Sequence, residues 1–162
     1  MSLLLKFLLN VRCLTSRKLL LVRAQCLSLK IGDTATLRKK ITSADIEKFA
    51  KLSGDTNPLH VDRNYVVAKT SFKNCLVHGA YLNSLVSSVI GTRLPGPGAV
   101  VVKEELNFPN PCYVEEEVKV TVRLREIRKI ITVDFTCVTD AGQVVLCGNA
   151  RLVINPSVNK IS

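Results

Sequence analysis

Two segments in the C-terminal half alternate apolar and polar residues without interruption, and this pattern constrains the fold more than any other feature. From Val118 to Arg125 every even position is valine or leucine, and from Ile131 to Cys137 every odd position is apolar. Successive side chains of a β-strand point to opposite faces, so each segment predicts a strand with one buried and one exposed face. Asp140–Gly142 then predicts a hairpin turn into a further strand over Gln143–Ile154.

Two helices are predicted before these strands. Thr42–Asp45 fits a capping box at the start of an amphipathic helix that ends at Gly54. A second helix begins near His78-Gly79 and is expected to end with Gly91 at its C-terminal cap. Its residues are apolar or small on most sides, which is typical of a buried helix.

The order of these elements predicts a single α+β domain over residues 31–162. Strands are also predicted at Asp33–Lys40 and, after the Pro95–Gly98 loop, at Ala99–Leu106. Strands joined by hairpins form an antiparallel sheet with one face toward the core, and that sheet must cover the apolar helix. A curved antiparallel sheet wrapped around a central helix is the hot-dog arrangement, and no internal repeat or linker interrupts it.

The basic charge of the chain is concentrated at its N-terminus. The 162 residues carry a formal net charge of +10, yet residues 1–30 hold six basic and no acidic residues, which leaves +4 for residues 31–162. Basic residues interrupt the apolar runs of residues 1–30, which we call the leader. The leader therefore lacks the apolar stretch of a secretory signal and resembles a mitochondrial transit peptide. We therefore expect a protein of the mitochondrial matrix. The alternative is a basic helix that packs on the domain or lies on a membrane surface. No apolar run reaches the roughly 18 residues that a membrane span needs.

The six cysteines stand at positions 13, 26, 75, 112, 137 and 147 and show no metal-ligand spacing. Without a secretory signal, a disulfide framework is not expected. We interpret all six as structural or incidental, and Cys137 and Cys147, which lie in apolar segments, as small buried residues.

The residues best suited to chemistry lie together between the two predicted helices, on a loop over Gly54–Asp62. A turn at Asn57-Pro58 can bring Asp55 and His60 close together. Histidine exchanges protons near neutral pH and a carboxylate can orient it, so such a pair can hold a water molecule and exchange protons with it. For either residue alone, a turn cap or a structural histidine would be the simpler interpretation.

The whole segment Leu52–Asp62 resembles the signature of the (R)-specific enoyl-thioester hydratases, also called MaoC-like dehydratases, which reads G-D-x-N-P-x-H. Every fixed position of that signature is present. The resemblance continues through Val77–Gly79, Gly91–Gly98 and Asn107–Val114, and so covers residues 33–154. Together with the predicted leader, it makes the chain most similar to the mitochondrial hydroxyacyl-thioester dehydratases.

The resemblance implies a hot-dog homodimer that dehydrates (3R)-hydroxyacyl thioesters reversibly to trans-2-enoyl thioesters, without a metal or a redox cofactor. Asp55 and His60 are the implied catalytic pair. Asn57 in the loop, Ser87 near the pair and Gly79 are the implied substrate-binding residues. The N–H of Gly79, at the start of the central helix, suits the thioester oxygen because enolate charge develops there. The leader favours acyl carrier protein as the thioester carrier, in fatty acid synthesis, and hydration of enoyl-CoA is the alternative.

Two departures from the family pattern leave the catalytic residues untouched. The segment His60–Gly79 is one residue longer than expected, which leaves the loop Ser71–Asn74 unplaced. Glu115-Glu116-Glu117 replaces the usual Gly-Asp-Glu, in a turn expected to lie away from the motif and to matter little.

Three other functions compete with this one. His60, Asp62 and His78 offer the ligand types of a two-histidine, one-carboxylate iron site. A hot-dog protein that only binds acyl chains, or a thioesterase, would keep the fold but not this loop. A nucleic-acid-binding module is suggested by the basic cluster, although aromatic residues are only 5% of the chain and a solvated sheet face explains the cluster more simply. That cluster comprises Arg123, Arg125, Arg128 and Lys129, interrupted by Glu126.

Overall fold

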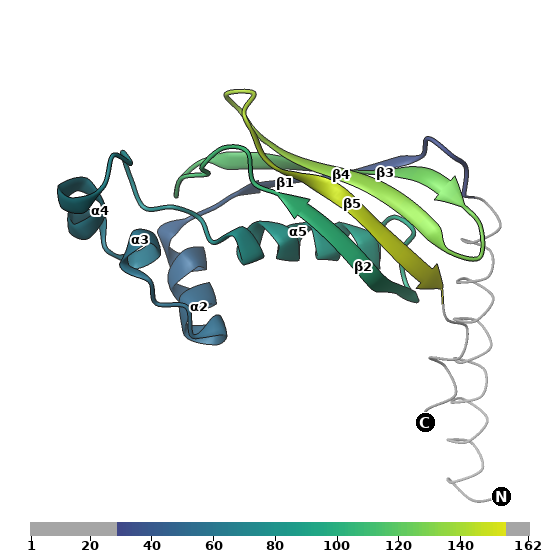
Figure 1. Ribbon diagram of the computed structural model, residues 1–162, viewed down its shortest axis with the longest axis horizontal. Coiled ribbons are helices and arrows are strands. Elements are labelled where there is room, and N and C mark those ends of the chain that lie inside the picture. The colour runs from purple at the N-terminus through teal and green to yellow at the C-terminus, as the bar shows by residue number, and fades with distance from the viewer. Residues whose placement is uncertain (1–28, 155–162) are drawn as a thin grey trace, which may run out of the picture.

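The computed structural model describes residues 29–154, in which a five-stranded sheet lies over one long helix (Figure 1). Apart from its last two residues, the predicted leader lies outside the described residues. Within them, no helix is long and apolar enough to span a membrane. The elements follow along the chain as β1 (Thr34–Lys40), α2 (Ser43–Ser53), α3 (Pro58–Val61), α4 (Arg63–Lys69), α5 (Gly79–Thr92), β2 (Ala99–Asn107), β3 (Glu117–Ile127), β4 (Ile131–Thr139) and β5 (Val144–Ile154).

The strands pair in the order β1-β3-β4-β5-β2, and every neighbouring pair is antiparallel. The hairpins β3–β4 and β4–β5 confirm the prediction, and Gly142 closes the second with a φ of 81°. The predicted strand at Ala99–Leu106 forms β2, which pairs with β5 at an edge of the sheet and not with β3, the next strand along the chain. The segment between β2 and β3 contains Pro109 and Pro111, which have no N–H to donate to a ladder, and it crosses the sheet to β3, which lies between β1 and β4.

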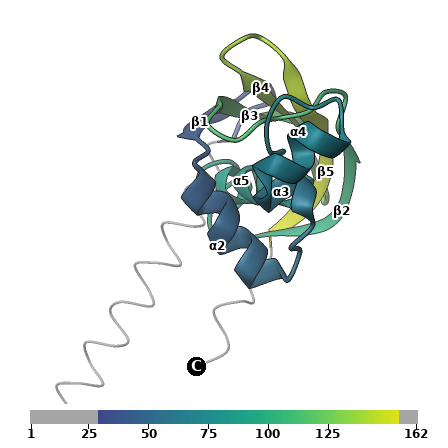
Figure 2. The same ribbon diagram turned by 90° about the vertical axis from the view of Figure 1, so that its left-hand side faces the viewer.

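The buried faces of the strands match the predicted alternation. All four even-numbered residues from Val118 to Leu124 are completely buried, and Val133 and Phe135 of β4 are buried beside them. Helix α5 packs against this face, where it contacts β1, β2, β3 and β5. Figure 2 shows the sheet curving around the helix, so the predicted α+β hot-dog arrangement is confirmed.

Helix α5 differs from its prediction on its outer face and at its end. Its apolar residues Leu82, Val86, Val89 and Ile90 are buried, but Ala80, Ser84, Ser87 and Ser88 are exposed, so in a single chain the sheet covers only one side. The helix also runs past Gly91 to Thr92. The left-handed glycine that closes this end is Gly96, with a φ of 94° and its N–H 2.9 Å from the carbonyl oxygen of Ile90.

Helix α2 begins and ends as predicted, with the capping box of Thr42 and Asp45 formed and Gly54 at its C-terminal cap. The short helices α3 and α4 were not predicted, and His60 therefore lies on α3 rather than on a loop. Figure 1 shows α2, α3 and α4 together at one end of the sheet, beyond the start of α5.

The described cysteines are free, and Cys75, Cys112 and Cys137 are buried as structural residues. Cys147 is partly exposed, so its predicted burial is wrong. The alternation of β5 places it beside buried Leu146 and therefore on the opposite, outer face of the sheet.

Candidate active site

The predicted catalytic motif is shaped by two helix caps in succession. Gly54 ends α2 in the left-handed conformation, with a φ of 79°, and its N–H bonds the carbonyl of Ala50 at 2.9 Å. Asp55 follows, and its Oδ1 accepts the N–H of Asn57 at 3.2 Å. Asn57 caps α3 by accepting the N–H of Leu59 at 3.1 Å, with proline at the first helical position. The chain therefore reverses at Asn57-Pro58, as the sequence predicted.

The orientation of the His60 ring is set by one hydrogen bond. Nδ1 lies 2.8 Å from the carbonyl oxygen of Leu76. A carbonyl oxygen can only accept, so Nδ1 carries the hydrogen and Nε2 of the neutral ring keeps its lone pair. Nε2 lies 3.9 Å from Oδ2 of Asp55. That separation is too long for a direct hydrogen bond. A single water molecule or hydroxyl group between the two atoms can hydrogen-bond to both of them.

His78 lies against this pair, although the only chemical role that the sequence suggested for it was that of a metal ligand. Its side chain is 2% exposed, and its ring stacks on that of His60 with 3.8 Å between ring centroids and 27° between ring planes. Its Nε2 lies 3.0 Å from the main-chain oxygen of Asp55. The position of His78 directly before Gly79 was the one sequence signal for it.

The N-terminus of α5 begins beside the pair, at Gly79. Within the described chain, the N–H groups of Gly79 and Ala80 have no hydrogen-bond acceptor, as expected of the first turn of a helix. A Cβ at Gly79 would lie 2.9 Å from Cε1 of Phe108, so a larger residue fits here only if this ring shifts. Free N–H groups and the positive end of the helix dipole are therefore presented next to Asp55 and His60.

Ser87 does not join this cluster in a single chain. It lies eight residues after Gly79, which corresponds to about 12 Å along the helix axis. Its side chain is exposed, and no hydrogen bond connects it to Asp55 or His60 in the part of the chain that the structure describes.

The predicted iron triad does not assemble. Asp62 instead caps α4, where its Oδ1 accepts the N–H of Tyr65 at 3.0 Å. A different trio, Asp55, His60 and His78, has ligand atoms within 4.8 Å of one another. Nε2 of His78, however, donates to the carbonyl of Asp55 and offers no lone pair, so this trio lacks the third ligand that such an iron site needs.

The two departures from the family pattern have clear structures. The additional length between His60 and Gly79 is taken up by α4 and by a loop in which the Lys73 ammonium lies 4.5 Å from the centre of the Tyr113 ring. Glu115 has a φ of 74°, a left-handed conformation that glycine adopts more easily. Its carboxylate accepts the N–H of Ser43, which lowers the pKa of Glu115, and the Lys40 ammonium lowers it further.

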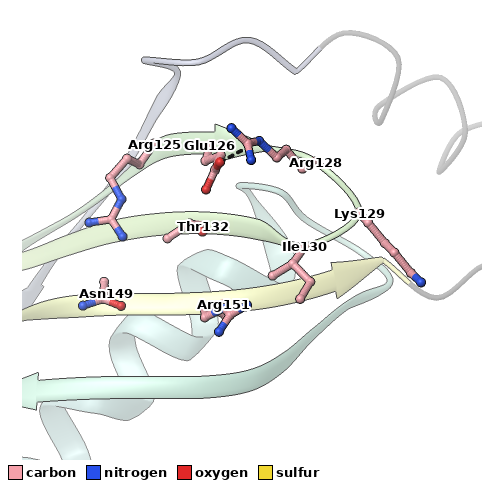
Figure 3. Close-up of a pocket in the computed structure, with 8 residues that line it drawn as sticks. All are labelled: Arg125, Glu126, Arg128, Lys129, Ile130, Thr132, Asn149 and Arg151. Carbon is pink, nitrogen blue, oxygen red and sulfur yellow. Dashed lines mark ion pairs between the residues drawn. The ribbon is translucent and has the colours of Figure 1, made fainter.

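The basic cluster lies on the outer face of the sheet, away from α5. It borders a hollow of about 460 Å³ at the β3–β4 turn (Figure 3), distant from the loop of Asp55 and His60, which packs near the start of β3. Arg125 pairs with Asp134 at 2.8 Å and Arg128 with Glu126 at 2.7 Å, so acidic neighbours offset part of the charge. The hollow is lined by Arg125, Glu126, Arg128, Lys129, Ile130, Thr132, Asn149 and Arg151.

Comparison with known proteins identifies the family. Residues 30–143 match the family described as the MaoC like domain. The chain is 41% identical to an (R)-specific enoyl-CoA hydratase of Rhodospirillum rubrum over 129 residues, which cover 78% of this chain and 88% of that protein. It is 32% identical to the mitochondrial 3-hydroxyacyl-[acyl-carrier-protein] dehydratase of Arabidopsis thaliana over 138 residues, covering 82% and 81% of the two chains.

The fold agrees with this identification. The solved structure of the (R)-hydratase from A. caviae superposes with a TM-score of 0.75 and 35% sequence identity, covering 79% of this chain and 98% of that one. The family match over residues 30–143 includes the Asp55–His60 segment. The chain belongs to the MaoC-like dehydratase family of hydro-lyases.

Proposed function

We propose that the protein catalyses the reversible (R)-specific hydration of trans-2-enoyl thioesters, with coenzyme A as the thioester carrier. The observation that carries this proposal is the lone pair of His60 Nε2, aimed at the Asp55 carboxylate beside the free N-terminus of α5. The choice of carrier follows the bacterial CoA-dependent relatives, which are more similar to this chain than the plant mitochondrial dehydratases.

In the proposed mechanism each group has one step. A water molecule between Asp55 and His60 gives a proton to Nε2 of His60 while its oxygen adds to C3 of the substrate. Charge then develops on the thioester oxygen, where the N–H of Gly79 can bond it. The pair returns the proton to C2, so the net change is the addition of water across the double bond. Dehydration is the same sequence in reverse.

The test is hydration of trans-2-enoyl-CoA substrates by the purified protein, with the chirality of the 3-hydroxy product assigned. Asp55→Asn and His60→Ala should each lower kcat by about 10²–10⁴, the usual contribution of a positioned acid or base. Asp62→Asn is the matched control, because this aspartate belongs to the same motif but caps α4. An (S)-product, or full activity in both Asp55→Asn and His60→Ala, would contradict the proposal.

Acyl carrier protein as the carrier is the second candidate, since the mitochondrial relatives in Arabidopsis and tomato are named for it. Both carriers are anionic, so the net charge of the domain does not separate them. Equal concentrations of crotonyl-CoA and crotonyl-carrier protein, compared by kcat/KM, distinguish them. A clear preference for the carrier protein would restore the expectation drawn from the leader.

We also propose a homodimer formed through β2. This strand is an edge of the sheet, and Val102 is 55% exposed on it, with Val100 and Val101 also exposed. An unpaired apolar edge strand is open to pairing with another chain, and a second copy is the partner that the family resemblance implies. Val102→Lys should shift the mass in analytical ultracentrifugation from dimer to monomer. An unshifted dimer would place the interface elsewhere.

Mitochondrial targeting is proposed from the basic, acid-free residues 1–30 and from the mitochondrial relatives. A reporter fused to these residues should accumulate in mitochondria. A cytosolic reporter would remove this proposal and leave the enzymatic one intact.

A further inference from the structure

The proposed reaction leaves one buried polar side chain at the catalytic loop without a role. His78 is 2% exposed, and its Nδ1 has no hydrogen-bond partner among residues 29–154. Burial of an unpaired polar atom costs free energy, so an apolar side chain would be the simpler choice at this position. The ring makes no capping bond to α5 either. Its remaining contacts must account for it.

The first contact holds the backbone of the catalytic carboxylate. Nε2 of His78 donates to the main-chain oxygen of Asp55 at 3.0 Å, across 23 residues of sequence. Within residues 29–154, every other hydrogen bond of residues 54–57 reaches a residue no more than four positions away. The Asp55 side chain is itself 52% exposed. The bond from His78 thus ties an exposed loop to the buried start of α5.

The second contact holds the catalytic imidazole. The His78 ring lies face to face with the His60 ring, and Phe49 backs it from another side with 5.2 Å between ring centroids. The Leu76 carbonyl fixes one edge of the His60 ring, and the stack fixes the plane of the ring. Both restraints together direct Nε2 of His60 toward Asp55.

We propose that His78 is a positioning residue, whose ring holds the His60 imidazole and the Asp55 backbone in one fixed relative geometry. This inference rests on the proposed hydratase function of the Asp55–His60 pair. Because His78 is buried and acts through the pair, its loss lowers kcat and leaves KM nearly unchanged. A reacting group misplaced by about 1 Å can lose about 10²-fold in rate.

The test compares three variants of the full 162-residue chain. His78→Phe keeps a ring against His60 but loses the donor, and His78→Gln keeps an N–H donor but loses the ring. Leu82→Ala is the matched control, because Leu82 is equally buried in the first turn of α5 and has no hydrogen bond to the loop. We expect kcat of His78→Phe to fall about 10- to 100-fold with KM within about twofold, and His78→Gln to recover part of the loss. Leu82→Ala should lower Tm with a much smaller change in kcat.

Two readouts separate positioning from general destabilisation. In a His60→Ala background, His78→Phe should lower the residual rate by a much smaller factor than it lowers the wild-type rate, because one of the two groups that it positions is gone. Amide hydrogen exchange of residues 54–60 should accelerate in His78→Phe and not in Leu82→Ala. An equal loss of rate in both backgrounds, or wild-type kcat in His78→Phe, would overturn the inference. A wild-type chain without hydratase activity would refute the proposed function, while unchanged exchange in His78→Phe would still refute the positioning role by itself.

Discussion

Replacing Gly79 by alanine tests the start of α5 as the site of the thioester carbonyl. The added Cβ would lie 2.9 Å from Cε1 and 3.0 Å from Cζ of the Phe108 ring, closer than side-chain carbons normally approach. The ring is 49% exposed and can shift, so the cost falls toward the lower end of the roughly 1–3 kcal/mol typical of overpacking. Alanine also stabilises a helix by roughly 0.5–1 kcal/mol relative to glycine, and part of this gain offsets the cost of the contact. We expect a net loss of about 1 kcal/mol in the free energy of unfolding.

The effect on catalysis should be much larger than the effect on stability. We expect a methyl group on the first residue of α5 to hinder the approach of the carbonyl to the free N–H groups. Loss of one such donor typically lowers kcat by about 10²–10³. Urea denaturation and steady-state hydration of crotonyl-CoA measure the two effects on the same preparation.

Gly91 provides the matched control, because it lies in the same helix and a Cβ there meets no atom within 4 Å. Gly91→Ala should raise the free energy of unfolding by about 0.5–1 kcal/mol and leave kcat unchanged. In a Phe108→Ala background, Gly79→Ala should lose its stability penalty but keep its loss of kcat. Wild-type kcat/KM in Gly79→Ala would refute the placement of the carbonyl at this helix start.

Three further predictions concern stability and thiol chemistry. Asp45→Ala should lower the free energy of unfolding by about 1 kcal/mol at neutral pH. The hydrogen bond from Lys39 is the main cause that lowers the pKa of Asp45 to about 2. The stabilisation by ionised Asp45 is therefore complete above its pKa in the unfolded chain, about 3.9, and should vanish as the pH falls toward 2, which urea denaturation at a series of pH values measures. Gly148→Ala should lower the free energy of unfolding by about 3 kcal/mol, measured by thermal melting, because its Cβ would overlap a β2 carbonyl. Cys112 and Cys137, whose pKa burial raises to about 12, should resist iodoacetamide at pH 8 until urea unfolds the chain, as mass spectrometry can show.

Local sequence rules predicted the elements of the fold better than their connections. The alternation of β3 and β4 and the capping box of α2 depend on neighbouring residues, and each was confirmed. The pairing of β2 with β5 depends on contacts more than 40 residues apart, such as Glu105 with Asn149, and no local pattern encodes it. The end of α5 was missed for a similar reason, because the closing bond comes from Gly96 beyond the proline.

The same distinction applies to the candidate site, where the residues close in sequence were predicted and the distant contacts were not. Asp55 and His60 were found because they are five residues apart and share one motif. The short helices that position them were missed because four and seven residues are too few for a helical period to show. The contact of His78 with both residues spans 18 and 23 positions, and a buried histidine beside a glycine has no distinctive sequence pattern.

Glu115, a departure from the family pattern, contacts the helix that leads to Asp55. The family places glycine where this chain has Glu115, and the observed φ of 74° explains that preference. The glutamate offsets its backbone strain with a contact that glycine cannot make, because its carboxylate binds the N–H of Ser43 at the start of α2. The same helix ends at Gly54, directly before Asp55. The turn was expected to matter little, yet it holds one end of the helix whose other end carries the catalytic loop. It follows that Glu115→Ala, which keeps the strain and loses the contact, should lower Tm more than Glu115→Gly.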